Sequence, residues 1–363
     1  MTFIFWQVII SPHQMPFLKA LALREEVSSV LLVVSKGEDQ RRAEMGWDFI
    51  RESTEKLQIL VTPSEEQTLG VMKHYENAHH FFSGITAIPM VFRAFKKSLD
   101  FEVRRYLIVE GPFYYKKPKF LHSIKTLLKE QKYFKFINKV YAIGSHSREW
   151  YKDWGFSKDQ VIPFAYCVDS NPFVPSINEQ LPKLIFVGSL IKRKGVDLLI
   201  NALRSTKISY KMEIIGNGNQ TAYLEDMVDR FDLRQRIFFK GVLDNRAVRE
   251  HISHSDVLVL PSRHDGWGAV VNEALMAGLF VICSDKCGAS DLIKDKFNGI
   301  VFTHQQKNSL TSSLDYCIEN IDRIRRKKAL IHEWSKKIEG KEMAKYMVES
   351  IEAQETVTPP WLR

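Results

Sequence analysis

The chain has 363 residues, of which 45% are hydrophobic and 12% aromatic, and its formal net charge is +9 at pH 7. This length exceeds one typical hydrophobic core, so we expect two domains, and the apolar content excludes an intrinsically disordered chain. The four cysteines lack the paired spacing and histidine partners of a zinc site, which fits a reducing, cytoplasmic compartment. No apolar run reaches membrane-spanning length.

The positive charge is concentrated in residues 91–140. This segment holds 13 Lys and Arg against 4 Asp and Glu, so its surplus equals that of the whole chain. It is also rich in aromatic residues, which are Phe92, Phe95, Phe101, Tyr106, Phe113, Tyr114, Tyr115, Phe120, Tyr133, Phe134 and Phe136. Such a mixture suits an anionic membrane surface, but it also suits single-stranded nucleic acid or a solvated basic face over a core.

Apolar segments and helical patterns alternate through the first half of the chain. We expect strands at Phe3–Ile10, Val30–Ser35, Leu57–Val61, His79–Ser83, Tyr106–Glu110 and Val140–Ile143. We expect helices at Pro16–Glu26, Glu65–His80, Pro89–Leu99 and Ser147–Trp154. This alternation predicts a parallel, doubly wound sheet.

The alternation restarts after a proline-rich stretch at 169–182, which is the predicted linker. Strands are expected at Leu184–Val187, Met212–Ile215, Ile237–Lys240, Val257–Leu260, Val281–Ser284 and Gly299–Val301. Helices are expected at Val196–Leu203, Thr221–Phe231 and Arg246–Ser253, and from Leu310 onward. The predicted domains are therefore 1–168 and 183–340, with a helical tail at 341–363 that packs back on the N-terminal domain.

The segment from Pro261 to Gly278 follows a predicted buried strand at Val257–Leu260 and combines a Gly-x-Gly turn with a helix. Such a junction aims backbone N–H groups and the positive end of a helix dipole at an anion, and Gly266 and Gly268 let a phosphate approach the backbone. Asp265 and Glu273 bracket the turn, and carboxylates beside an anion site accept hydrogen bonds from sugar hydroxyls. The pattern therefore indicates a ligand in which a sugar is joined to a phosphate.

A second strand–glycine–helix junction runs from Leu184 through Gly188 to Gly195 and carries Lys192, Arg193 and Lys194. Fixed cations of this kind stabilise a leaving diphosphate more in the transition state than before bond cleavage. A third strand ends in the glycine turn that contains Gly216.

These motifs resemble those of the retaining GT-B glycosyltransferases of family 4 (glycosyl transferases group 1). Asp265-Gly-Trp-Gly-Ala-Val-Val-Asn-Glu273-Ala is similar to their E-G-F-G-L-x-x-x-E-A element, with aspartate in place of the first glutamate. The Gly188 junction is similar to G-R-L-x-x-x-K-G, with Lys194 on the lysine and Ser189 in place of the arginine. The resemblance covers roughly residues 140–303 well and the first half loosely.

The resemblance implies two Rossmann-like domains facing a central cleft and assigns roles to residues. Glu273 would bind the ribose hydroxyls, Asp265 a hydroxyl of the donor sugar, and Lys194 and Arg193 the diphosphate. The remaining donor-binding candidates are Gly188, Gly216, Val242, Leu243, Gly266, Trp267, Gly268, Ala269 and Val270.

His13, Gln14 and Glu110 are the acceptor-binding candidates, because each follows or ends a strand of the N-terminal domain at the edge where doubly wound folds bind ligands. His13 could instead contact the donor phosphates, and a structural role for His13 or Glu110 is the other alternative. No Asp-x-Asp triplet occurs, so we expect no metal and no cofactor beyond the donor substrate.

The function expected is retaining transfer of a sugar from a nucleotide-diphosphate sugar to a glycan or polyprenyl-linked acceptor in bacterial surface polysaccharide biosynthesis. The enzyme would be cytoplasmic or peripheral on the inner face of the cell membrane. Alternatives are a non-catalytic sugar-nucleotide-binding partner subunit and an epimerase of nucleotide-diphosphate sugars. A nucleic-acid-binding protein is disfavoured because no RNP-like or helix-turn-helix pattern occurs.

Overall fold

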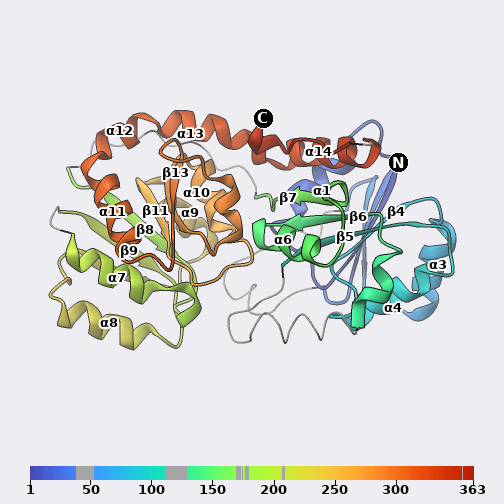
Figure 1. The fold of residues 1–363 in the computed structure, drawn as a ribbon, viewed down its shortest axis with the longest axis horizontal. Helices are drawn as coiled ribbons and strands as arrows, with labels where there is room; N and C mark the ends of the chain where they lie inside the picture. The colour runs from blue at the N-terminus through green and yellow to red at the C-terminus, as the bar shows by residue number, and fades with distance from the viewer. Residues whose placement is uncertain are drawn as a thin grey trace. The chain divides into compact units, whose positions relative to one another are not determined.

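The computed structural model describes residues 1–37, 53–111, 129–168, 173, 175, 180–206, 209–353 and 355–363. The chain forms two compact units (Figure 1). The N-terminal unit consists of Met1–Asp169 together with Ile338–Arg363, and the C-terminal unit consists of Ser170–Lys337.

Seven parallel strands form one sheet in the described part of the N-terminal unit, in the order β3-β2-β1-β4-β5-β6-β7. The strands are β1 (Thr2–Gln7), β2 (Ser29–Val34), β3 (Leu57–Val61), β4 (His79–Phe82), β5 (Arg104–Glu110), β6 (Lys139–Ile143) and β7 (Val161–Phe164). The helices are α1 (Met15–Ala22), α3 (Glu65–His74), α4 (Pro89–Ser98), α6 (Ser145–Asp153) and α14 (Gly340–Glu352).

Both faces of this sheet are buried, as the nearly continuous apolar strands require. On one face Trp6 and Phe82 stack, and Phe82 meets Phe95 of α4 edge to face. On the other face Phe5 packs edge to face against Phe17 of α1. The helices therefore cover the sheet on both sides, which is the doubly wound arrangement.

Helix α14 belongs to the N-terminal unit although it lies near the end of the chain (Figure 1). The Tyr141 hydroxyl and the Ser350 hydroxyl are 2.8 Å apart, and Lys139 donates to the carbonyl of Ala353 at 3.1 Å. Gly340 lies so close to α1 that a Cβ there would be 2.4 Å from the carbonyl oxygen of Pro16. The last helix is thus fixed to both α1 and β6.

Several element boundaries differ from the sequence prediction, and one strand was not predicted at all. The helix predicted at Glu65–His80 ends at His74, because a turn at Tyr75–Ala78 leads directly into β4. The first strand ends at Gln7 rather than Ile10. Strand β7 is not predicted because it contains Pro163, which is tolerated here since β7 is the last strand of the sheet.

The C-terminal unit has a six-stranded parallel sheet within its described residues, in the order β10-β9-β8-β11-β12-β13. Its strands are β8 (Lys183–Val187), β9 (Lys211–Ile215), β10 (Ile237–Gly241), β11 (Val257–Leu260), β12 (Phe280–Ser284) and β13 (Gly299–Phe302). Its helices are α7 (Val196–Ser205), α8 (Thr221–Arg230), α9 (Asn245–Ser253), α10 (Val270–Met276), α11 (Ser309–Glu319), α12 (Ile321–Arg326) and α13 (Lys328–Ser335). The predicted α/β class with two Rossmann-like domains is confirmed.

Within the described residues, no helix is both long and apolar enough to cross a membrane.

Candidate functional site

Three glycines lie side by side at the carboxyl edge of the C-terminal sheet: Gly188 follows β8, Gly216 follows β9, and Gly241 is the last residue of β10. The N–H of Gly216 donates to the carbonyl of Gly241 at 2.7 Å, and a Cβ on Gly216 would lie only 2.0 Å from the carbonyl oxygen of Gly188. The backbones of the three glycines are therefore in direct contact.

The basic loop after β8 is folded against the loop after β11. Lys192–Lys194 form one turn of 3-10 helix, which ends at Gly195 with φ of 72°. A Cβ at Gly195 would lie 2.1 Å from the carbonyl oxygen of Pro261, so only glycine allows this approach. This contact brings the two predicted motifs together although they are distant in sequence.

Asp265 forms an ion pair with Lys194 at the meeting point of these loops. The Lys194 ammonium is 2.6 Å from one carboxylate oxygen, and the Arg193 guanidinium is 3.5 Å from the other. Burial raises the pKa of the Asp265 carboxyl, but the charge and hydrogen bond of Lys194, followed by the charge of Arg193, outweigh burial and hold the pKa below its usual value. Asp265 is therefore an anion, and the structure groups three predicted catalytic residues.

The turn after Asp265 leads into α10. Gly268 has φ of 92° and packs against Cys287 and Leu260. In the described part of the chain, no backbone oxygen accepts a hydrogen bond from the N–H of Gly268, Ala269 or Val270. These N–H groups are available to an anion.

The side chain of Trp267 is not available to a ligand. It is 2% exposed, and its indole N–H donates to the Asn272 amide oxygen at 2.7 Å. The predicted contact of Trp267 with a ligand is therefore limited to its backbone.

Glu273 lies in the first turn of α10 and is 9% exposed. Burial raises the pKa of its carboxyl to about 7, and the positive charge of Arg249 opposes this only in part. None of the hydrogen bonds or ion pairs among the described residues involves this carboxylate. Glu273 is thus a buried acid without a protein partner in that part of the chain, and hydroxyl donors of a ligand would satisfy it.

The other candidates occupy more open positions. Val242 is 56% exposed directly after β10, and Leu243 beside it is partly exposed. Large exposed apolar side chains of this kind next to a glycine edge provide a surface for a flat, apolar ring face.

The acceptor candidates belong to the N-terminal unit. Gln14 is the residue before α1 and is buried, and the His13 carbonyl accepts a hydrogen bond from the N–H of Cys167 at 3.0 Å. The His13 ring is 6.2 Å from that of Tyr166, which follows β7. Glu110 is exposed at the end of β5. All three lie at the carboxyl edge of their sheet, as predicted.

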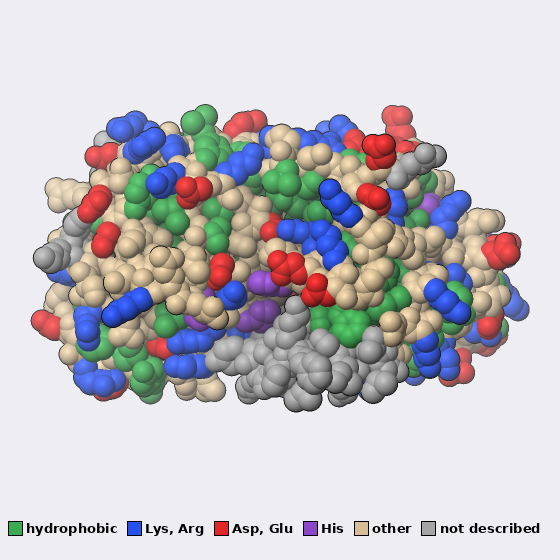
Figure 2. All heavy atoms as spheres, viewed as in Figure 1, with side chains coloured by type: hydrophobic (Ala, Val, Ile, Leu, Met, Phe, Trp, Pro, Cys, Tyr) green, Lys and Arg blue, Asp and Glu red, His purple; other side chains and the backbone are tan. Residues whose placement is uncertain are grey.

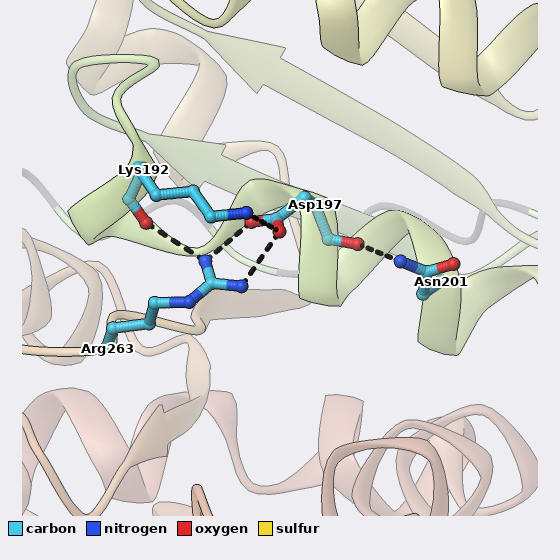
Figure 3. A network of polar contacts seen from close by, with 4 residues as sticks. All are labelled: Lys192, Asp197, Asn201 and Arg263. Carbon is cyan, nitrogen blue, oxygen red and sulfur yellow. Dashed lines mark hydrogen bonds and ion pairs between the residues drawn. The ribbon is translucent and has the colours of Figure 1, made fainter.

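Sequence reasoning missed two residues that join the loops of the C-terminal unit, Asp197 and Arg263. The Arg263 guanidinium contacts the Asp197 carboxylate at 2.6 and 2.8 Å (Figure 3). The only local signal is their place, since Asp197 follows Gly195 by two positions and Arg263 precedes Asp265 by two.

No group of three or more His, Cys, Asp or Glu side chains that could hold a metal ion occurs among the residues that the structure describes.

The two Rossmann-like units define the GT-B fold. A solved structure of the lipopolysaccharide outer core galactosyltransferase WaaB aligns with a TM-score of 0.74 and 16% identity, covering 97% of this chain and 99% of that protein. Anabaena HepE in complex with UDP aligns with a TM-score of 0.70 and 12% identity over 97% of this chain and 99% of its own.

Residues 168–333 match the family of glycosyl transferases group 1. An uncharacterised glycosyltransferase of Methanocaldococcus jannaschii is 27% identical over 180 residues, which is 49% of this chain and 44% of that protein. An O-antigen biosynthesis glycosyltransferase of Escherichia coli is 32% identical over 34% of this chain and 33% of its own length. The matches thus extend over less than half of these relatives.

Proposed function

We propose that the chain is a retaining glycosyltransferase of family 4 that transfers a sugar from a nucleotide-diphosphate sugar to a glycan or lipid-linked acceptor. The observation that carries the proposal is the pairing of Asp265 with Lys194 and Arg193, in a segment that continues through the N–H groups of Gly268, Ala269 and Val270 to the buried, unpartnered Glu273. A diphosphate, a sugar and a ribose each have a matching group in this cluster. The similarity to glycosyltransferases at the level of family and fold supports the same reading.

Lys194 and Arg193 stabilise the leaving diphosphate. Negative charge on the leaving phosphate increases as the bond to the sugar breaks, so fixed cations lower the barrier without binding the ground state equally well. Because Asp265 pairs with both cations, they are held in place before the donor arrives. The Gly268, Ala269 and Val270 N–H groups add neutral donors to the same anion.

Glu273 binds the ribose through its two hydroxyls. A carboxylate that is buried and unpartnered gains most from such donors, because they replace the water it has lost. Val242 and Leu243 then lie against the base, and main-chain contacts near Gly241 complete the nucleotide subsite.

Retention follows from front-face attack, in which the leaving phosphate accepts the proton of the acceptor hydroxyl. The site then depends on orientation and phosphate stabilisation rather than on a strong base. His13 and Glu110 bind the acceptor in this proposal. The proposed reaction needs no metal, so activity is expected to persist in the presence of a chelator.

A thermal-shift screen of UDP-, GDP-, ADP- and CDP-sugars on the wild type and Glu273→Ala tests the donor site. A ligand that binds only the folded state raises the melting temperature by mass action. One nucleotide is expected to stabilise the wild type by about 3 kcal/mol at 100 times its Kd and to stabilise the variant far less. Failure of every nucleotide sugar to stabilise the wild type would contradict the donor site, whereas stabilisation without turnover of the donor would favour the non-catalytic sugar-nucleotide-binding partner subunit.

The acceptor is proposed to be lipid-linked because of the basic, aromatic surface of the N-terminal unit. In the described part of residues 91–140, the partly buried rings of Phe92 and Tyr133 pack with the fully buried Phe95 of α4, and Tyr133 lies 5.8 and 5.6 Å from Phe92 and Phe95 between ring centroids. The exposed cations around this contact are Arg93, Lys96, Lys129, Lys132 and Lys135. Figure 2 shows Lys and Arg side chains over α4 beside hydrophobic ones. Phe113, Tyr114, Tyr115 and Phe120 lie outside the described residues.

Liposome co-sedimentation tests this surface. The protein is expected to bind vesicles with about 30% anionic lipid and to be released as salt rises from 0.05 to about 0.5 M, because screening shortens the range of charge interactions. The paired variant Lys132→Glu/Lys135→Glu should bind about 30-fold more weakly or worse, since each of the two lysines near the surface contributes about 1 kcal/mol. Equal binding to neutral vesicles would contradict the electrostatic contribution.

A further inference from the structure

Arg263 and Asp197 form a two-pronged ion pair between the loop after β11 and the first turn of α7. Two guanidinium nitrogens of Arg263 contact the two carboxylate oxygens of Asp197 at 2.6 and 2.8 Å, and Lys192 donates to the same carboxylate at 2.9 Å (Figure 3). A fork that meets a carboxylate with two parallel bonds fixes orientation as well as distance.

The ion pair between Arg263 and Asp197 is largely shielded from water. The side chains of Arg263 and Asp197 are 17% and 10% exposed. Burial raises the pKa of the Asp197 carboxyl, but the hydrogen bonds and charges of Arg263 and Lys192 together hold the pKa below its usual value. A charge of this kind cannot be left without its partner, because water does not replace it fully.

Main-chain bonds tie the same two loops together around this pair. The N–H of Arg263 donates to the carbonyl of Arg193 at 2.8 Å, and its guanidinium donates to the carbonyl of Lys192 at 2.9 Å. In return, the guanidinium of Arg193 donates to the carbonyl of His264 at 2.9 Å. Each loop thus holds the other through both backbone and side chains.

Lys194 is the residue whose position depends on this arrangement. Its backbone lies in the loop that Arg263 holds, and its ammonium reaches Asp265, two positions after Arg263. A lysine side chain is long and flexible, so it occupies one place only when both its own backbone and its partner are fixed.

We propose that Arg263 and Asp197 are positioning residues for the reaction, which hold the Lys192–Gly195 loop against the Pro261–Asp265 loop so that Lys194 and Arg193 meet the diphosphate in one arrangement. The inference rests on the proposed function. In this proposal neither residue touches the substrate, and both act through Lys194 and Arg193.

A second ion pair on the same strand provides a matched control. Arg325 of α12 contacts Asp256, just before β11, at 3.0 and 2.9 Å, and their side chains are 12% and 9% exposed. The two pairs have the same chemistry and similar burial at opposite ends of β11. Arg325→Lys therefore reproduces the loss of stability expected of Arg263→Lys, but at a place away from the Lys192–Gly195 and Pro261–Asp265 loops.

The experiment compares Arg263→Lys, Asp197→Asn and Arg325→Lys in the full chain, by thermal unfolding, pyrophosphate binding and turnover of the donor that stabilises the wild type. All three variants should lose a similar few degrees of melting temperature. Only Arg263→Lys and Asp197→Asn should bind pyrophosphate more weakly and lower kcat, by about 10- to 100-fold, while the KM for the donor changes much less.

Equal kcat and equal pyrophosphate affinity in Arg263→Lys and Arg325→Lys would overturn the proposal and leave the pair a structural one. Wild-type protein that does not bind pyrophosphate would overturn it as well. If the wild type binds pyrophosphate but turns over no nucleotide sugar, the proposed function fails. The positioning role is then decided by the pyrophosphate affinities of the variants alone.

Discussion

Replacing Lys194 with glutamine is expected to lower kcat for donor turnover by about 100- to 1,000-fold, the usual effect of removing one group that stabilises a developing anion. Glutamine can still donate a hydrogen bond to Asp265, so the buried carboxylate keeps a neutral partner in place of the ammonium at 2.6 Å. The loss therefore reports on charge rather than on collapse of the loop. The measurement is steady-state kinetics with the nucleotide sugar found in the thermal-shift screen.

Two further variants serve as controls for the glutamine substitution at Lys194. Lys194→Arg keeps the charge and should retain more activity than the glutamine variant. Lys240→Gln removes another lysine–carboxylate pair of the same unit, to Glu213 at 3.3 Å, and should leave kcat within about twofold, since exposed pairs contribute little. A glutamine variant that turns over donor at the wild-type rate would remove Lys194 from the proposed machinery.

Replacing Glu273 with glutamine is expected to stabilise the protein at pH 8 relative to the wild type, but much less at pH 5. The folded-state pKa of Glu273 is about 7, above the ordinary 4.5. The folded state then binds the proton more tightly than the unfolded state, so wild-type stability falls as pH rises from about 4.5 to about 7. The relative gain of the variant should reach about 3 kcal/mol above that range.

Urea unfolding of both proteins at pH 5, 6, 7 and 8 measures this difference. Glu250→Gln, an exposed position on α9, is the control and should show no such pH dependence. A difference between Glu273→Gln and the wild type that is constant across the range would mean that Glu273 is not the buried acid described above. Because ribose hydroxyls favour the ionised carboxylate, donor affinity of the wild type should rise with pH through about 7.

The strands were predictable because buried parallel strands are nearly continuous apolar runs, and twelve of the thirteen described strands fall on predicted ones. Strand β7 was not predicted because Pro163 removes a backbone hydrogen-bond donor. The proline is tolerated only because β7 lies at the edge of the sheet, which a local sequence pattern does not reveal. The end of α3 was misjudged because the residues after His74 keep an acceptable helical composition, while the pairing of His79 with Phe3 decides for a strand.

In the candidate site, too, the residues in local motifs could be predicted, whereas the contacts between distant parts of the chain could not. Lys194 and Asp265 could be picked out because each lies in a local strand–glycine–helix motif. Their contact joins residues 71 positions apart, and the pair of Arg263 and Asp197 spans 66 positions. Such contacts depend on the order of strands in the sheet, which places β8 beside β11. The burial of Trp267 is a packing outcome of the same kind.

The return of α14 to the first unit has a consequence for the order in which the protein is made. Residues 338–363 are synthesised after the whole of the C-terminal unit, so Tyr141 and Lys139 have no α14 to bond until that unit has been made. The C-terminal unit is one continuous stretch of chain and has all its strands earlier. Domains usually fold in order from the N-terminus during synthesis. Here the C-terminal unit can complete its fold while the N-terminal unit still lacks α14, which packs on α1 and β6.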